Sequence, residues 1–551
     1  MPETFVTATP APAAAKPAGL IRSSMIYSFF TLISRVMGLA RDLALTYYLG
    51  ASATFAADAY NMGFSFPNLF RRIFAEGAFA SAFVPAYSKA LASDGEEVAD
   101  LLAADAMAVL AAGALAVTVV AELTMPWLMY AIAPGFHGAK HDLAVRLTQI
   151  MMPYLPCMAI YAHLSGVLNG RNRFILSAAA PILLNLWTLL AVWPAHNTLQ
   201  AAYFASWGVI VAGISQAALL WWGVRHSGAN VDIRRPRLTP AIKALIGLAV
   251  PGAIAASAFQ VNVFISSMLV SQVNGARTWL TVCDRLYMLP QSLVGVAIGV
   301  ALLPRLSRRV HAGDKVGSHA AIDEAVVFSL ALSLPAAAAL VAMPYFLIDG
   351  LYTRGEFTHF DAHATAQALQ QYGWGVPAFV LSQLFSRVFF ASQDTRTPMR
   401  YALISVAVNI AAGVTLFHYV GVGGIAAATS LASWVNVVMM LSALHKRGLY
   451  EPSAKTISRL SRALAASAVL GGLLGLASHF RPVIQGWLHG AHFGPLGPKE
   501  MVILALTVLA GAIFPFLLFA SGGLTIAEVK GALRRRPGES NKTVPGAQDL
   551  G

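Results

Sequence analysis

Long apolar stretches, separated by short polar connections, recur along the whole sequence. A helix needs about 20 apolar residues to cross the hydrocarbon core of a bilayer, and stretches of this length with few charges are typical of transmembrane helices. The second stretch is too long for a straight crossing, so we expect a kink at Pro67 or a tilted helix. The pattern predicts an all-α integral membrane protein with fourteen spans, near residues 25–49, 56–88, 101–130, 144–168, 174–195, 199–222, 241–271, 277–304, 320–348, 364–391, 399–419, 422–444, 459–479 and 500–521.

The composition supports a membrane protein and argues against a soluble one. Of 551 residues, 57% are hydrophobic and only 11% are charged, whereas soluble domains carry about 25% charged residues. The two cysteines, Cys157 and Cys283, both lie in apolar stretches, so no disulfide framework is expected. No GxxxxGK[ST] sequence is present, which argues against direct ATP hydrolysis by this chain.

The basic residues predict the orientation. If the N-terminus is cytoplasmic, most of the 38 lysines and arginines fall on cytoplasmic connections, as the positive-inside rule requires. Both termini are then cytoplasmic. The net charge of +13 is explained by an anionic inner leaflet, and nucleic acid is not expected as a partner. The few basic residues on the outer side are Lys140, Arg146, Arg277, Arg354, Arg481 and Lys499.

A weak internal repeat divides the spans into two similar halves. The segment 168–185 resembles 390–409, with Asn185 and Asn409 in similar places, and 66–89 resembles 289–308. The offset of about six spans is even, which predicts two parallel lobes with a site between them near the midplane. The predicted organisation is a disordered cytoplasmic tail at 1–22, an N-lobe at 23–228, a C-lobe at 238–448, an extra pair of spans at 455–522 and a second cytoplasmic tail at 523–551.

Ionisable residues inside the apolar stretches are the candidate functional residues. A charged side chain at bilayer depth costs about 2.5–3.5 kcal/mol on insertion scales, so these residues should line a polar cavity. Arginines from both halves would clamp phosphate oxygens through bidentate hydrogen bonds. The candidates for this clamp are Arg35, Arg41, Arg71 and Arg285, and the acidic candidates for the cavity or its gates are Asp42, Asp58, Glu76 and Asp284.

The alternative is that these charges only pair with one another. Arg72 and Glu76 share one face of the second span, and Arg41 could pair with Asp58. The core arginines nearly balance the core carboxylates, so the composition of the spans leaves this alternative open. No metal site and no cofactor are predicted.

Three stretches carry a resemblance to a known family. SRVMGLARD, DAYNMGFSFPNLFRRIFAEGAFASAFVP and CDRLYMLPQSLVGVAIGVALLP resemble the bacterial lipid II flippases, the MurJ or MviN family, within the multidrug/oligosaccharidyl-lipid/polysaccharide exporter superfamily. The likeness covers nearly the whole chain. It implies two six-span lobes that alternate between inward-open and outward-open states in the bacterial cytoplasmic membrane.

The resemblance also implies a substrate and roles for residues. The substrate would be lipid II, the undecaprenyl-diphosphate-linked peptidoglycan precursor, carried from the inner to the outer leaflet. The essential arginines of the family match Arg35, Arg41, Arg71 and Arg285, and its acidic positions match Asp42, Asp58 and Glu76. The extra pair of spans would form a groove for the lipid tail. Nothing is carried over to the connection 480–499.

Other functions remain as alternatives. An exporter of another polyprenyl-linked oligosaccharide fits the same arginines, whereas an exporter of cationic drugs does not. A polyprenyl-linked membrane glycosyltransferase needs paired catalytic carboxylates on a sizeable loop, and the outer connections offer no such pair; a scaffold role would leave the arginines unexplained. The sequence leaves open whether membrane potential, a proton or a sodium ion drives transport, and whether cell-wall synthesis or division proteins are partners.

Overall fold

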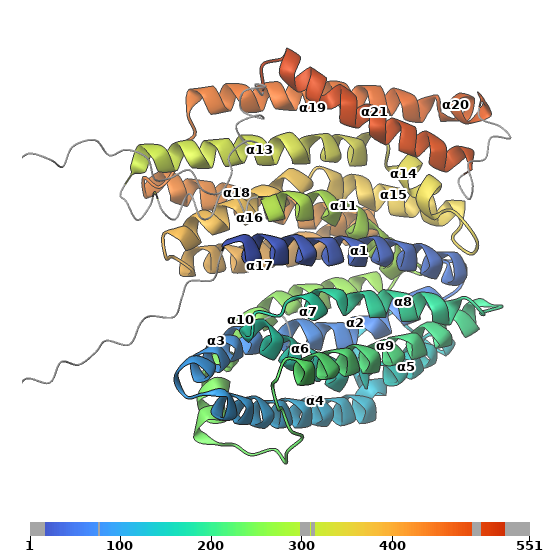
Figure 1. The fold of residues 1–551 in the computed structure, drawn as a ribbon. Helices are drawn as coiled ribbons and strands as arrows, with labels where there is room; N and C mark the ends of the chain where they lie inside the picture. The colour runs from blue at the N-terminus through green and yellow to red at the C-terminus, as the bar shows by residue number, and fades with distance from the viewer. Residues whose placement is uncertain (1–16, 75–77, 298–308, 310–313, 488–496, 524–551) are drawn as a thin grey trace, which may run out of the picture. The chain divides into compact units, whose positions relative to one another are not determined.

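The fold was analysed in a computed structural model, which describes residues 17–74, 78–297, 309, 314–487 and 497–523 (Figure 1). All regular secondary structure in this part of the chain is helical. The chain divides into two compact units. Unit 1 comprises residues 1–278 and 354–358, and unit 2 comprises 279–353 and 359–551.

Unit 1 is built from the first ten helices. The short helices pair with longer ones, since α5 and α6 share one apolar span and so do α7 and α8. The bounds are α1 (Pro17–Leu49), α2 (Ala56–Phe74), α3 (Ala78–Ser93), α4 (Glu96–Ile132), α5 (Ala139–Met151), α6 (Tyr154–Gly170), α7 (Ile175–Ala179), α8 (Pro181–Val192), α9 (Thr198–His226) and α10 (Pro240–Val270).

Unit 2 contains nearly all of α11, which begins at the border between the units, and the helices that follow. The pair α15 and α16 is bent by 42°. The bounds are α11 (Ala276–Ala297), α13 (Lys315–Ala342), α14 (Pro344–Tyr352), α15 (His359–Gly373), α16 (Val376–Ala391), α17 (Arg396–Val420), α18 (Val422–Lys446), α19 (Ala454–His479), α20 (Arg481–Trp487) and α21 (Pro498–Ala520).

As far as their residues are described, the predicted apolar intervals each fall on one or two of these helices. Among the described residues, nine helices are long and apolar enough to cross a membrane, or ten if the bent pair α15–α16 counts as one span. The prediction of an all-helical membrane protein is therefore confirmed at this coarser level, while the number of fourteen spans and the cytoplasmic position of both termini stay predictions.

Two boundaries differ from the sequence prediction. Residues 17–22 belong to helix α1, although they were predicted as part of a disordered tail. In the long second interval the structure describes α2 and α3, and residues 75–77 between them lie outside the described residues. Unit 1 also includes α10, which the sequence analysis assigned to the second lobe, because α10 packs against α2, α3 and α4.

Two turns of equal geometry lie at corresponding places of the predicted internal repeat. After α6, Arg173 N–H donates to the Leu168 carbonyl at 2.8 Å, and after α16, Asp394 N–H donates to the Phe389 carbonyl at 3.0 Å. Two non-glycine residues with positive φ among the described residues, Asn172 and Gln393, lie in these turns, each with φ of 59°. The turns support the predicted repeat, with a register one residue away from the sequence alignment of 168 with 390.

Helices within unit 1 approach one another closely where residues are small. On α9, Ala201, Ala202 and Ala205 are completely buried, and a Cβ added at Gly208 would lie 2.9 Å from the Ala191 Cβ of α8. Small residues let helix backbones come together in a membrane, where packing rather than the hydrophobic effect drives association. This packing gives unit 1 a firm frame for its charged side chains.

Candidate functional site

Helix α1 holds its charged residues in two different environments. Arg35 is exposed, and the apolar side chains on the same face, Leu32 and Val36, are 61% and 60% exposed. The helix is fixed just before Arg35, where Asn185 of α8 donates its side-chain N–H to the Ser34 carbonyl at 3.0 Å. Arg35 is therefore an exposed residue on a helix whose backbone is held by α8.

Two turns further along α1, Arg41 and Asp42 form a buried ion pair. Arg41 Nη2 lies 2.7 Å from Asp42 Oδ1, and Arg41 Nε lies 3.1 Å from the same oxygen. Arg41 is 7% exposed and Asp42 is 9% exposed. The predicted alternative pairing of Arg41 with Asp58 is wrong, because Arg41 bonds to its own neighbour and Asp58 has other partners.

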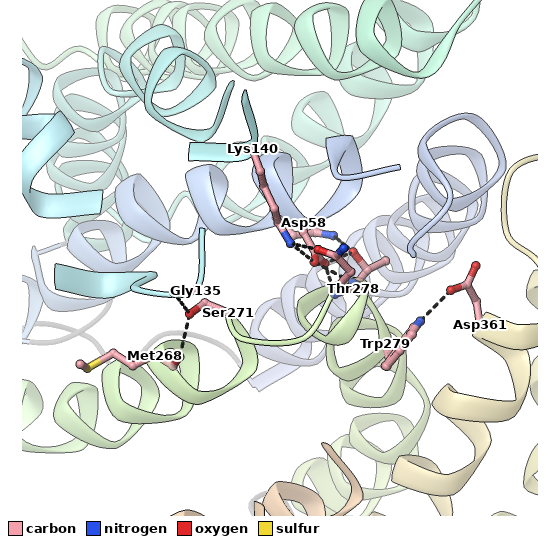
Figure 2. Close-up of polar contacts among 11 residues, drawn as sticks. Asp58, Gly135, Lys140, Met268, Ser271, Thr278, Trp279 and Asp361 are labelled. Carbon is pink, nitrogen blue, oxygen red and sulfur yellow. Dashed lines mark hydrogen bonds and ion pairs between the residues drawn. The ribbon is translucent and has the colours of Figure 1, made fainter. Parts of the chain in front are cut away.

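Helix α11 presents Arg285 on one face and packs with another. Trp279, Cys283 and Tyr287 recur at every fourth position and are all buried in unit 2. Trp279 Nε1 donates to Asp361 Oδ1 at 3.0 Å, as Figure 2 shows, and Tyr287 stacks on Tyr372 with ring centroids 4.5 Å apart.

The opposite face of α11 holds the charged candidate. Arg285 is exposed, and so are Met288 and Leu289 at 42% and 45%. Asp284 beside it is half-buried. Arg285 in unit 2 thus resembles Arg35 in unit 1: each is an exposed arginine next to exposed apolar side chains, on a helix whose other side is held by packing.

Among the predicted acidic residues that the structure describes, Asp58, at the beginning of α2, is the most completely buried. Its residue is 0% exposed, and Figure 2 shows donors converging on it. Lys140 Nζ lies 2.9 Å from Oδ2. The Gly275 N–H donates to Oδ2 at 2.8 Å, and Thr278 donates to Oδ1 through its N–H at 3.2 Å and its hydroxyl at 3.0 Å. Lys140 Nζ also donates to Asn274 Oδ1 at 2.9 Å. We call these five residues the Asp58 network.

The Asp58 network joins distant segments of unit 1. Gly275 and Thr278 lie at the N-terminus of α11, where backbone N–H groups lack partners within the helix. A carboxylate there satisfies these groups and interacts favourably with the helix dipole, so Asp58 caps α11 from another helix. Lys140 supplies the counter-charge that a fully buried carboxylate needs.

A second contact holds the end of α10 against the turn after α4. The Gly135 N–H donates to Ser271 Oγ at 3.0 Å, and this hydroxyl donates to the Met268 carbonyl at 2.7 Å (Figure 2). A Cβ at Gly135 would lie 2.4 Å from the Ser271 carbonyl oxygen, so only glycine permits this approach. The backbone around the Asp58 network is therefore closely packed.

Three charged residues of the second apolar stretch have side chains outside the described residues. Arg71 and Arg72 belong to α2, but their side chains are outside the described residues, and so is Glu76. The predicted pairing of Arg72 with Glu76 and the role of Arg71 stay predictions.

Two features of the polar framework are not predicted by the sequence. Lys140 was assigned to an outer connection, yet it is 8% exposed and balances Asp58. In unit 2, Asp349 is 1% exposed and lies among three basic groups: Arg481, Lys499 at 3.2 Å and His359 at 3.1 Å. Both clusters join residues that are far apart in the sequence, so no local pattern predicts them. The one sign in the sequence is a basic residue on an outer connection next to an apolar span, where basic residues are rare.

Comparison with known proteins gives consistent results. A family profile described as "Lipid II flippase MurJ" matches residues 45–492. A protein of Rhizobium tropici named "Probable lipid II flippase MurJ" is 37% identical, over 96% of this chain and 99% of its own length. A "Lipid II flippase MurJ" of Burkholderia cenocepacia is 32% identical, over 90% of this chain and 97% of its own.

Solved structures support the fold. One titled "Lipid II flippase MurJ, inward closed conformation" matches with a TM-score of 0.67 at 23% identity, covering 84% of this chain and 100% of that one. An inward-facing MATE family transporter of the MOP superfamily matches with a TM-score of 0.64 at 13% identity, covering 77% and 98%. At these identities the likeness concerns the fold alone.

Proposed function

The chain belongs to the MurJ family of lipid II flippases, and from this premise we propose that it moves lipid II from the inner to the outer leaflet of the bacterial cytoplasmic membrane. In this proposal the chain is a transporter and not an enzyme. It spans the membrane fourteen times with both termini in the cytoplasm, and it works by alternating access. The support is its similarity to named flippases over nearly its whole length.

We assign the diphosphate of the substrate to the arginines of the apolar helices. The observation that carries this assignment is the exposure of Arg35 and Arg285, each on a helix whose other faces are held by packing. An arginine facing lipid would be costly, so exposed arginines on apolar helices are expected to face a polar environment. A diphosphate supplies oxygens in the geometry that guanidinium forks bind best.

Arg41 and Arg71 have different places in this proposal. Arg41 is bound to Asp42 in the structure, so it can contribute to substrate binding only as part of this pair, for example by exchanging its partner when substrate arrives. Arg71 stays a candidate on the grounds of the family resemblance. Asp284 and Glu76 remain candidate acidic residues.

The Asp58 network is proposed as a latch that opens during transport. It holds α2 and α5 to the beginning of α11 through one carboxylate. Alternating access requires such contacts to form in one state and break in another. A single acid with several donors suits this role, because its hydrogen bonds are lost together when α11 moves away.

The test is translocation by the purified protein in vesicles. Fluorescent lipid II would be incorporated into both leaflets, and its transfer followed by a reagent that reaches only the outer leaflet. Other polyprenyl diphosphates, with different sugars, serve as competing substrates. Selective transfer of lipid II supports the proposal. Equal transfer of all polyprenyl diphosphates would instead support a general exporter of polyprenyl-linked oligosaccharides, and no transfer would contradict both.

A further inference from the structure

The connection between α9 and α10 contains an exposed basic segment. Residues 232–238 read DIRRPRL, and all of them are exposed. Ile233 is 82% exposed and Leu238 is 61% exposed. The segment contains three arginines, Arg234, Arg235 and Arg237, and one carboxylate, that of Asp232. We call this segment the strap.

Both ends of the strap are anchored in one apolar cluster of unit 1. Ala229 and Val231, just before the strap, are 3% and 2% exposed, and Ile242 and Leu245, just after it, are 2% and 6% exposed. All four pack in the cluster formed around α3 and α4. The exposed residues are therefore a short loop held on both sides and not a free linker.

A polar clamp fixes the first end of the strap. The Asn230 N–H donates to Asp100 Oδ2 at 2.6 Å. Asp100 Oδ1 accepts from Arg171 Nη2 at 3.1 Å and from the Tyr87 hydroxyl at 3.2 Å. Arg171 also donates to the Ser227 carbonyl at the end of α9, at 3.3 Å. This clamp joins the ends of α6 and α9 to α3 and α4, so the strap begins at a fixed point.

The flanking helices place the strap at the level of lipid headgroups. Helix α9 exposes apolar side chains, including Trp207 at 56% and Ile214 at 57%. Near its end lies Trp222, which is 53% exposed and contacts the ring of His226 in a tilted arrangement. Exposed tryptophan at the end of an apolar span marks the membrane interface. Helix α10 begins directly after the strap and soon exposes Leu248 at 69%.

We infer that the strap is a binding surface for anionic phospholipid headgroups of the leaflet in which α9 ends and α10 begins. Its arginine forks match phosphate oxygens, and Ile233 and Leu238 at its two sides enter the boundary of the acyl chains. Each arginine near an anionic surface strengthens the interaction roughly fivefold. Among the described residues, no ion pair joins these three arginines to a carboxylate. Lipid is favoured over an acidic protein because the strap joins the ends of two apolar helices, and α9 carries an exposed tryptophan near its end, where an interface is expected.

The experiment places a spin label on the strap of the full-length protein. Ile233→Cys is introduced after Cys157→Ala and Cys283→Ala, and the protein is reconstituted in phosphatidylcholine with or without phosphatidylglycerol. Collision with a water-soluble nickel chelate and with oxygen reports the depth of the label. Phosphatidylglycerol should lower the nickel accessibility several-fold and raise that of oxygen, and high salt should partly reverse this change because it screens exposed charges.

Two charge-neutralising variants make the test specific. Arg234→Gln, Arg235→Gln and Arg237→Gln together should abolish the response to phosphatidylglycerol. A matched control removes three exposed charges from unit 2, through Arg396→Gln, Arg400→Gln and Lys446→Gln, and should leave the response intact. A label whose depth is unchanged by phosphatidylglycerol, or a strap variant that responds as the parent does, would overturn the inference, and an acidic protein partner would then be the occupant to seek. Lipid II transfer is not needed for this test, so its outcome is independent of the proposed function.

Discussion

Charged side chains have opposite environments in the Asp58 network and on the exposed face of α1. Asp58 is fully buried, and its oxygens accept from an ammonium group, two backbone N–H groups and a hydroxyl. Arg35, on an equally apolar helix, is exposed beside apolar neighbours. In unit 1, the buried charge of Asp58 is thus part of the packing, whereas the exposed charge of Arg35 is not. On α11, likewise, the buried rings lie on one face and the exposed Arg285 lies on the other.

The largest expected effect follows from removing an exposed arginine. Arg35→Ala and Arg285→Ala should each reduce lipid II translocation by about 10- to 100-fold or more, because a hydrogen bond to a charged group contributes about 1.5–3 kcal/mol and each arginine makes several. Folding should be nearly unaffected. Transfer rates in vesicles and thermal unfolding in detergent measure both quantities, with Arg396→Ala, an exposed arginine of α17, as the control.

The lysine variants separate the effect of positive charge from that of guanidinium geometry. Arg35→Lys and Arg285→Lys keep the charge but lose the planar fork that binds two oxygens. We expect translocation to stay well below that of the parent. Full activity in both lysine variants would show that positive charge alone suffices, and the diphosphate clamp would have to be abandoned.

In the Asp58 network, substitution should act on folding as well as on transport. Lys140→Met leaves a buried carboxylate without its counter-charge, and loss of one partner of a buried pair costs about 3–5 kcal/mol. Asp58→Asn should also destabilise the fold, because the side-chain NH2 group of the asparagine would face hydrogen-bond donors. The double variant should be less destabilised than the sum of the two. Additive effects in chemical or thermal unfolding would indicate that Lys140 and Asp58 do not interact.

Asp349 in unit 2 should show a smaller loss. Its partners Arg481 and Lys499 have side chains 15% and 37% exposed, so water compensates part of the lost interaction in Asp349→Asn. We expect a destabilisation of about 1–3 kcal/mol. A change equal to that of the Lys140 variant in the same unfolding assay would mean that the partial exposure of the partners has no protective effect.

The smallest effect concerns Asp394 at the beginning of α17. Hydrogen bonds from Thr397 and then the Arg447 guanidinium lower the pKa of this carboxyl below its ordinary value. Its contribution is therefore complete above the unfolded pKa of about 3.9 and is lost as pH falls through the lower folded pKa. Asp394→Asn should cost about 1 kcal/mol near neutral pH. The difference from the parent should shrink below about pH 4, and a difference that grows there would contradict this sign.

The sequence predicted the helices well because the lipid environment imposes long apolar stretches. It also singled out Arg35 and Arg285, which are exposed in the structure, because a charge in such a stretch is rare; their role in substrate binding stays a prediction. It did not predict the partner of Asp58, because Lys140 lies 82 residues away and no local pattern joins them. Adjacent helical residues do not normally face each other, so the Arg41–Asp42 pair was not anticipated either. The structure shows this pair because a long arginine side chain can fold back on its neighbour.

The most direct test of the account is outer-leaflet transfer of labelled lipid II by the parent, Arg35→Ala and Arg285→Ala in matched vesicles. Equal amounts of folded protein in each preparation must be verified first. The account predicts transfer by the parent and near-background transfer by both variants. Transfer at the parental rate by both variants would contradict the claim that these arginines bind the diphosphate.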